Sequence, residues 1–254
     1  MDTSRPIALV TGGIRGLGRN MAIRLAEKGN DVVLTYRSRR DEAENVVAEI
    51  AARGGRAVAL QLDVGKAATF DAFARTVAAA LRDTWQRERF EFLVNNAGEG
   101  LHTPFAETTE AQFDELVAVH LKGVFFLTQK LLPLMSDGGR IVNISSGLAR
   151  FSIPGYSAYA AMKGAIEVLT RYLAKELGAR GIAANVVAPG AIETDFNGGA
   201  LRSNAALNAM VASNTALGRT GQADDIGGVV ASLLSPDNRW INAQRIEASG
   251  GMFL

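Results

Sequence analysis

The chain alternates short apolar runs with longer stretches that have helical periodicity. The apolar runs occupy residues 7–12, 31–36, 57–64, 90–98, 140–146, 182–190 and 245–248. The expected helices between them occupy residues 15–28, 41–53, 67–86, 110–134, 157–178 and 223–234. Strands that are apolar on both faces and are joined by helices form parallel sheets with helices on both sides. We therefore predict a doubly wound α/β fold with seven parallel strands.

The whole chain, residues 1–254, is predicted to form a single domain, because no linker or internal repeat divides it. The one long stretch without a regular pattern is 191–221, which is rich in small and polar residues. We expect this stretch to form an irregular, mobile lid over a substrate.

Composition excludes several classes of function. The net charge is +1 and the basic residues are scattered, so we expect no binding to nucleic acid or to a membrane, and a small-molecule partner instead. No cysteine is present and the two histidines are far apart, so no metal site is expected. No run approaches 18 apolar residues and the first 14 residues lack the apolar core of a signal peptide, which predicts a cytoplasmic protein.

The first apolar run is followed by TGGIRGLG, which opens directly into a helical stretch. Its glycines are Gly12, Gly16 and Gly18, and Leu17 lies between the last two. Glycines let the backbone approach a pyrophosphate, and the start of the helix presents N–H groups and a positive dipole to the anion. Tight strand-to-helix turns also use glycine for structural reasons alone, but this position favours a dinucleotide.

The second strand indicates which dinucleotide is bound. Sites selective for NAD have an acid near its end for the ribose 2′-hydroxyl, whereas this chain has Tyr36 and then Arg37. A 2′-phosphate would attract Arg37 and Arg15, so we predict NADP(H) as the cofactor. For Arg39 and Arg40 the simpler interpretation is a solvated loop and helix start.

A possible reacting centre lies in SAYAAMKGAIEVLT. Tyr159 and Lys163 are four residues apart, so a helix places them on one face. A lysine ammonium at that distance would lower the pKa of the tyrosine and promote proton transfer. The strand before it ends in Ser145 and Ser146, at the sheet edge where open α/β folds bind ligands.

Together these motifs resemble the short-chain dehydrogenase/reductase family. The resemblance runs from about Ile7 to Met252 and rests on TGGIRGLG, NNAG at 95–98, YAAMK at 159–163 and PGAIET at 189–194. It implies a Rossmann-type sheet with strand order 3-2-1-4-5-6-7. It also implies a homotetramer or homodimer formed through the helices at 110–134 and 157–178.

The resemblance also implies roles for individual residues. Ser146, 13 residues before Tyr159, would hydrogen-bond the substrate oxygen; Tyr159 would transfer the proton; Lys163 would lower the tyrosine pKa and hold the nicotinamide ribose. The expected cofactor contacts beyond the glycine loop, Arg15, Arg37, Tyr159 and Lys163 are Asp63, Val64, Asn96, Ala97, Gly98, Pro189, Gly190, Ile192 and Thr194.

Two segments depart from the family pattern. Members usually carry an asparagine where this chain has His120, in AVHLKGVFF, and that asparagine completes a catalytic tetrad. His120 either takes part in the same proton relay or only fills the helix; if it takes part, His120→Asn should shift the pH dependence between about pH 6 and 7.5. Near the C-terminus, residues 242–244 read NAQ where many members read TGQ.

The substrate is less constrained by the sequence. The expected pocket residues are Glu99, Leu101, His102, Phe151, Ile153, Tyr156 and Phe196. The overall pattern and Arg15 with Arg37 resemble reductases of 3-oxoacyl thioesters, carried on acyl carrier protein or coenzyme A. Sugars, quinones, steroids and small diketones remain alternatives, as does a non-catalytic NADP(H) sensor.

Overall fold

Seven parallel strands form one sheet in the order β3-β2-β1-β4-β5-β6-β7, as predicted. The structure, a computed structural model, describes residues 5–254 apart from the side chain of residue 197. The strands are β1 (Ile7–Val10), β2 (Asp31–Tyr36), β3 (Ala57–Gln61), β4 (Phe90–Asn95), β5 (Met135–Ile144), β6 (Ala183–Pro189) and β7 (Arg245–Ala248).

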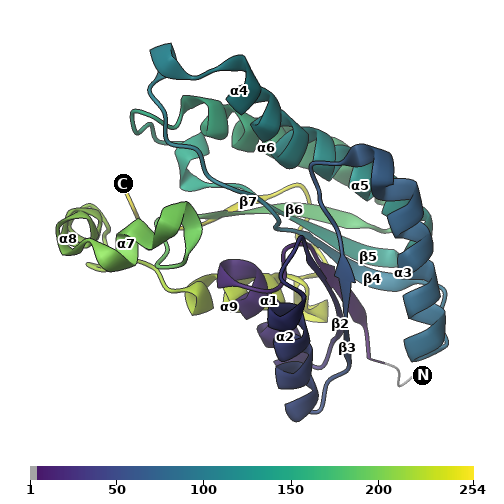
Figure 1. Cartoon of the computed structure of the whole chain (residues 1–254). Helices are drawn as coiled ribbons and strands as arrows, with labels where there is room; N and C mark the ends of the chain where they lie inside the picture. Colours follow the sequence, from purple (N-terminus) through teal and green to yellow (C-terminus); the bar gives the residue numbers. More distant parts are fainter. Residues whose placement is uncertain (1–4) are drawn as a thin grey trace.

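Helices cover both faces of the sheet (Figure 1). One face carries α1 (Gly16–Glu27), α2 (Arg40–Ala52) and α9 (Ala223–Leu233); the other carries α3 (Phe70–Trp85), α4 (Glu110–Leu116), α5 (Gly123–Leu131) and α6 (Ser157–Glu176). Alternate strand residues divide between the two cores: in β1, Ala8 and Val10 pack with α1, whereas Ile7 and Leu9 pack with α3. Burial on both faces explains why the strands read as continuous apolar runs.

The helix predicted over 110–134 changes its geometry near its middle. Between α4 and α5 the backbone forms a π-helical segment, η3 (Val117–Lys122), in which Gly123 N–H donates to the carbonyl of Ala118. Gly123 also lies against the loop after β3, where an added Cβ would be 2.4 Å from the carbonyl oxygen of Val64. The widened turn contains His120 at its centre.

The stretch predicted to be irregular contains short helices: η7 (Phe196–Gly199), α7 (Ala200–Ser203) and α8 (Ala205–Ser213). Its ends are closed by a bridge between Ile192 and Gly221. Glu193 accepts hydrogen bonds from Asn208 (2.6 Å) and Thr220, which ties α8 to the base of the stretch. The prediction of an irregular structure was wrong here, and the mobility of the stretch stays a prediction.

The helix spanning Glu110–Leu134 is long and apolar enough to cross a membrane by length and composition, but 39% of its apolar window is buried. Leu127 and Leu131 belong to the core beneath the sheet. Phe113, Phe125 and Phe126 are exposed. This is the helix expected to contact a second subunit, and that contact stays a prediction.

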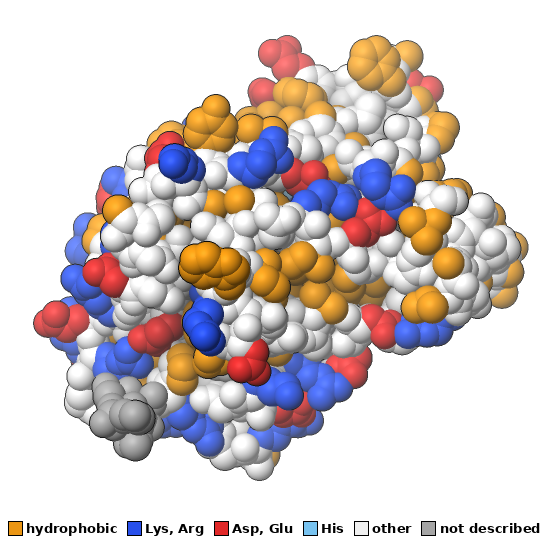
Figure 2. All heavy atoms as spheres, turned by 180° about the vertical axis from the view of Figure 1, so that it is seen from behind, with side chains coloured by type: hydrophobic (Ala, Val, Ile, Leu, Met, Phe, Trp, Pro, Cys, Tyr) orange, Lys and Arg blue, Asp and Glu red, His pale blue; other side chains and the backbone are white. Residues whose placement is uncertain are grey.

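Basic and acidic side chains are interspersed on the face seen in Figure 2. Ion pairs among the described residues include Arg180 with Asp137 and Arg219 with Asp225. The expectation that the protein does not bind nucleic acid stays a prediction.

Two adjacent glycines in α9 provide a test of its packing on α1. A Cβ at Gly227 would lie 1.8 Å from Oδ1 of Asn20, whereas a Cβ at Gly228 would meet nothing within 4 Å. Gly228→Ala should raise the free energy of unfolding by about 0.5–1 kcal/mol, because it removes backbone entropy from the unfolded chain. Gly227→Ala should lower it, because α1 must move. Denaturant unfolding measures both; equal effects would contradict this packing.

Candidate active site

The carboxyl edge of the sheet opens into a cavity of about 630 Å³. Every residue predicted to act in catalysis or cofactor binding lines this cavity. Many of them lie in the loops that follow β1, β4 and β6. The structure therefore brings the four sequence motifs together at one place.

The three glycines of the first loop meet different steric demands. Gly12 and Gly16 have φ of +65° and +51°, a region that favours glycine. Gly18 has no room for a side chain, because a Cβ would lie 2.0 Å from the carbonyl oxygen of Gly12. Helix α1 begins at Gly16 without a side-chain cap and without an acid in its first turn, so its first N–H groups can bind an anion.

The loop is held by residues that the sequence analysis missed. Thr35 Oγ1 accepts from Gly12 N–H at 3.0 Å, and Thr11 Oγ1 accepts from the N–H groups of Asn96 (2.9 Å) and Ala97 (3.0 Å). Asn96 Nδ2 in turn donates to the carbonyl of Thr11 at 2.9 Å. Both threonines could have been found from their positions: Thr35 lies near the end of β2, and Thr11 directly follows β1.

The two predicted phosphate ligands, Arg15 and Arg37, are exposed at this end of the cavity. Arg37 lies 3.7 Å from Glu99, and its side chain keeps 65% exposure, so the pair is loose. Arg39 and Arg40 form ion pairs with Glu42 and Glu44, both at 2.7 Å. Of these four arginines, Arg15 and Arg37 are the two without a close ion pair, and their contact with a 2′-phosphate stays a prediction.

The adjacent serines after β5 face different partners. Ser145 Oγ donates to Glu167 Oε1 (2.8 Å) and to the carbonyl of Lys163 (3.3 Å), so it fastens β5 to α6. Ser146 Oγ accepts from Leu148 N–H (3.2 Å) and forms a hydrogen bond with Tyr159. Ser146, and not Ser145, therefore lies beside the tyrosine, as the family spacing implied.

Tyr159 and Lys163 are both buried on the cavity side of α6. Lys163 Nζ donates to the carbonyl of Ile144 at 2.9 Å and lies 5.4 Å from the centre of the Tyr159 ring. Burial raises the pKa of Tyr159 above its usual value, and the hydrogen bond with Ser146 opposes this shift. Burial also lowers the pKa of Lys163 to about 8.

The effect of the Lys163 charge on the pKa of Tyr159 stays a prediction. In the protein itself, burial is the largest influence and raises this pKa. Tyr159 therefore keeps its proton at neutral pH, which suits a group that donates a proton to a carbonyl oxygen.

His120 is 2% exposed and reaches the cavity from the π-helical segment. Its Nε2–H donates to the carbonyl of Glu99 at 2.7 Å, and its ring stands edge-on to Tyr159 at 5.3 Å. Nδ1 has no hydrogen-bond partner among the described residues. Gly98 makes room for the ring, since a Cβ there would lie 2.6 Å from Cε1 of His120.

The environment of His120 keeps it neutral. Burial, helped by the charge of Lys163 and opposed by the bond to Glu99, lowers its pKa to about 3. Because Nε2 carries the proton, Nδ1 is an acceptor, which is compatible with a place in a proton relay. This low pKa argues against a titration of His120 between pH 6 and 7.5, and the effect of His120→Asn on the pH profile stays a prediction.

The substrate end of the cavity differs in part from the expected set. Phe151, Ile153, Tyr156 and Phe196 line the cavity as predicted, and so does Glu99, whose carboxylate lies 3.7 Å from Arg37. Leu101 instead packs against the cluster of Leu116, Tyr159 and Met162, and His102 packs edge-on against Tyr156 at 4.9 Å. Lining residues that the sequence analysis missed include Leu148, Leu201, Leu207, Met210, Val211, Met252 and Phe253.

The pKa of His120 leads to a test. His120→Asn should leave the pH profile of kcat/KM between pH 6 and 7.5 unchanged, because the histidine it replaces is already neutral there. The measurement is initial rate against pH with any accepted ketone. A shifted profile in this window would show that His120 does titrate during turnover.

Comparisons with known proteins agree with this site. Residues 12–253 match the family described as enoyl-(acyl carrier protein) reductase. The 3-oxoacyl-[acyl-carrier-protein] reductase FabG of Staphylococcus aureus is 37% identical over 249 residues, covering 97% of this chain and 98% of that protein.

Solved structures are equally similar. The promiscuous reductase LugOII, which catalyses keto-reduction at C1 during lugdunomycin biosynthesis, is 38% identical, with a TM-score of 0.93 and 98% of each chain covered. The angucycline C-6 ketoreductase LanV, solved with bound NADP, is 35% identical, with a TM-score of 0.92 and 98% and 95% of the chains covered. The sheet order, the motifs brought together at its edge and these full-length matches show that the chain belongs to the short-chain dehydrogenase/reductase family.

Proposed function

We propose that this protein is an NADP(H)-dependent reductase of ketones carried on a bulky, aromatic framework. The observation that carries the proposal is the composition of the cavity wall. Phe151, Tyr156, Phe196 and Phe253 all line it, and Phe196 lies 6.1 Å from the ring of Tyr159. Aromatic side chains of this kind bind flat apolar ligands through edge and face contacts.

The polar groups at the inner end of the cavity match one chemical step. When bound, the nicotinamide supplies the hydride to the carbonyl carbon. Tyr159 donates its proton to the carbonyl oxygen, and the Ser146 hydroxyl positions that oxygen through a hydrogen bond. Lys163, held by the carbonyl of Ile144, carries positive charge beside the tyrosine and stabilises the anion as the proton leaves.

A 3-oxoacyl thioester on acyl carrier protein is the competing substrate, favoured by the similarity to FabG. An acidic carrier protein would need unpaired cations beside the cavity. Arg150 and Arg202, which are sequence neighbours of the lining residues Phe151 and Leu201, are paired with Glu247 and Asp195. The similarity to an angucycline ketoreductase also favours the aromatic ketone.

A substrate screen tests the proposal. NADPH oxidation should be faster, by kcat/KM, with 1-tetralone or a naphthoquinone than with acetoacetyl-coenzyme A. Tyr159→Phe should lower kcat at least about 100-fold, because the proton donor is lost, while the Kd for NADPH changes far less. A preference for the thioester would replace the aromatic substrate, and full activity in Tyr159→Phe would contradict the mechanism.

Cofactor preference is tested at Arg37. Arg37→Asp should raise the Kd for NADPH about tenfold or more and change the Kd for NADH little, because it removes a charge-assisted contact to the 2′-phosphate. Arg40→Asp is the matched control, since Arg40 is already paired with Glu44. Fluorescence titration gives both constants. Equal NADPH and NADH affinities in the parent protein would contradict the assignment.

A further inference from the structure

The last residues of the chain return to the active site. Met252 and Phe253 line the same cavity as Ser146 and Tyr159, and the Phe253 ring stands edge-on to Phe151 at 5.0 Å. In Figure 1 the C-terminus lies near α7 and α8. Through Met252 and Phe253, the C-terminal segment, defined here as residues 249–254, therefore forms part of the cavity wall.

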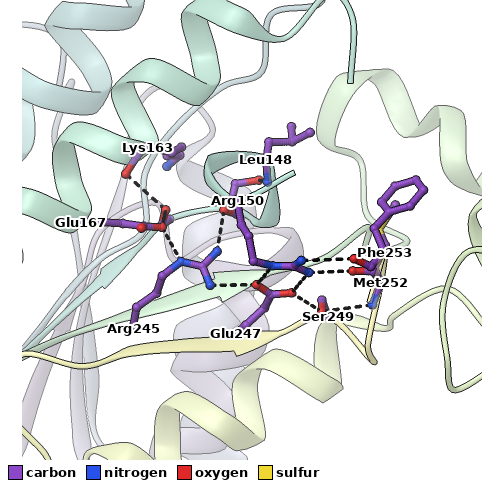
Figure 3. Close-up of polar contacts among 11 residues, drawn as sticks. Leu148, Arg150, Lys163, Glu167, Arg245, Glu247, Ser249, Met252 and Phe253 are labelled. Carbon is purple, nitrogen blue, oxygen red and sulfur yellow. Dashed lines mark hydrogen bonds and ion pairs between the residues drawn. The ribbon is translucent and has the colours of Figure 1, made fainter. Parts of the chain in front are cut away.

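The guanidinium of Arg150 is one of the groups that hold this segment in place. Arg150 donates to the carbonyl oxygens of Met252 (2.8 Å) and Phe253 (3.2 Å) and to both carboxylate oxygens of Glu247 (2.7 and 2.6 Å), as Figure 3 shows. Arg150 directly follows the short turn η5 (Gly147–Ala149), which begins at Ser146. The cation thus joins the serine loop to the C-terminal segment.

Glu247 connects the same contact to the catalytic helix. It accepts from Ser249 Oγ (2.7 Å) and from Arg245 (2.8 Å), and Arg245 also donates to Glu167 on α6 (2.8 Å). Glu167 is the partner of Ser145. Hydrogen bonds from Arg150 and Arg245 lower the pKa of Glu247 to about 2, so the carboxylate is charged at every physiological pH.

The segment is also attached to the stretch that follows α8. Ala216 N–H and Leu217 N–H donate to the carbonyls of Gly251 (3.2 Å) and Gly250 (3.1 Å), and Phe253 N–H donates to Asn214 (2.9 Å). Loosening the C-terminal segment would therefore also loosen the helix that supplies Leu207, Met210 and Val211 to the cavity.

We propose that Arg150 and Glu247 form a latch that makes the C-terminal segment the outer wall of the substrate site and selects bulky aromatic ketones. The selection rests on the proposed reductase function. Arg150 is a positioning residue, because its guanidinium contacts the wall and not the reacting atoms. Phe253 is the specificity-determining side chain, because it presents its ring to the cavity beside Phe151.

Arg150→Met tests the latch with two ketones of different size. The KM for 1-tetralone should rise about tenfold or more, while kcat/KM for 2,3-butanedione and the Kd for NADPH stay within about twofold of the parent, because the small ketone does not reach the wall. Phe253→Ala should have the same selective effect without disturbing the ion pairs, which covers a failure of Arg150→Met to fold. Equal losses with both ketones, or no change with 1-tetralone, would overturn the proposal.

Arg180→Met is the matched control. Arg180 has the same kind of partners, Asp137 (2.7 Å) and the carbonyls of Leu132 (3.0 Å) and Met135 (2.6 Å), but at the opposite end of β5. Arg180→Met should change neither the KM for 1-tetralone nor kcat/KM for 2,3-butanedione. A change equal to that of Arg150→Met would show a general loss of stability and overturn the latch.

A binding measurement separates this proposal from the proposed function. 1-Naphthol has no carbinol hydrogen and cannot be oxidised by hydride loss, so calorimetry of its binding to the NADP⁺ complex needs no turnover. Weaker binding of 1-naphthol to Arg150→Met and Phe253→Ala would support the role of the C-terminal segment as a wall of the site, even if the parent protein reduces no ketone. Active parent enzyme with undiminished 1-naphthol binding in both variants would refute the wall alone.

Discussion

The carboxyl end of β4 is the point on which both halves of the site depend. Asn95 and Asn96 are adjacent and face opposite sides of the strand. Asn95 donates to Thr128 on α5 (3.0 Å) and to Asn143 on β5 (2.8 Å), and Asn143 donates to Thr170 on α6 (2.9 Å). Asn96 holds the glycine loop through Thr11. One dipeptide thus fixes the phosphate end relative to the helices that carry the reacting groups.

Buried hydrogen bonds of this kind specify position more than they add stability. The side chains of Asn95 and Asn143 are almost wholly buried, and each finds its partners within the protein. Since hydride and proton transfer both require fixed distances, an inflexible base for the loop and for α6 is what the chemistry needs. The substrate wall, by contrast, is built from the last helices and the C-terminal segment, which can differ without moving this base.

The parts of the site that the sequence predicted were those with local signals. Strand periodicity, the glycine turn and the four-residue spacing of Tyr159 and Lys163 each depend on neighbouring residues alone. Phe253 gave no such signal, because its place in the cavity depends on Arg150, about a hundred residues earlier in the chain. Leu101 was misplaced for the same reason: apolar character does not distinguish a cavity wall from a core cluster. The pKa values of His120 and Tyr159 depend on burial, which motifs do not reveal.

The π-helical segment at Val117–Lys122 has a consequence for how the sequence of this chain can vary. A π-helical turn contains one residue more than the α-helical turn it replaces. Deleting a single residue there would restore a regular helix, but would rotate every side chain on one side of the deletion by about 100° relative to the other. His120 would then lose either Glu99 or its place beside Tyr159. The extra residue therefore changes the direction in which the following side chains point. It allows side chains at one end of the helix to pack into the sheet core while His120, at the middle, lies beside Tyr159.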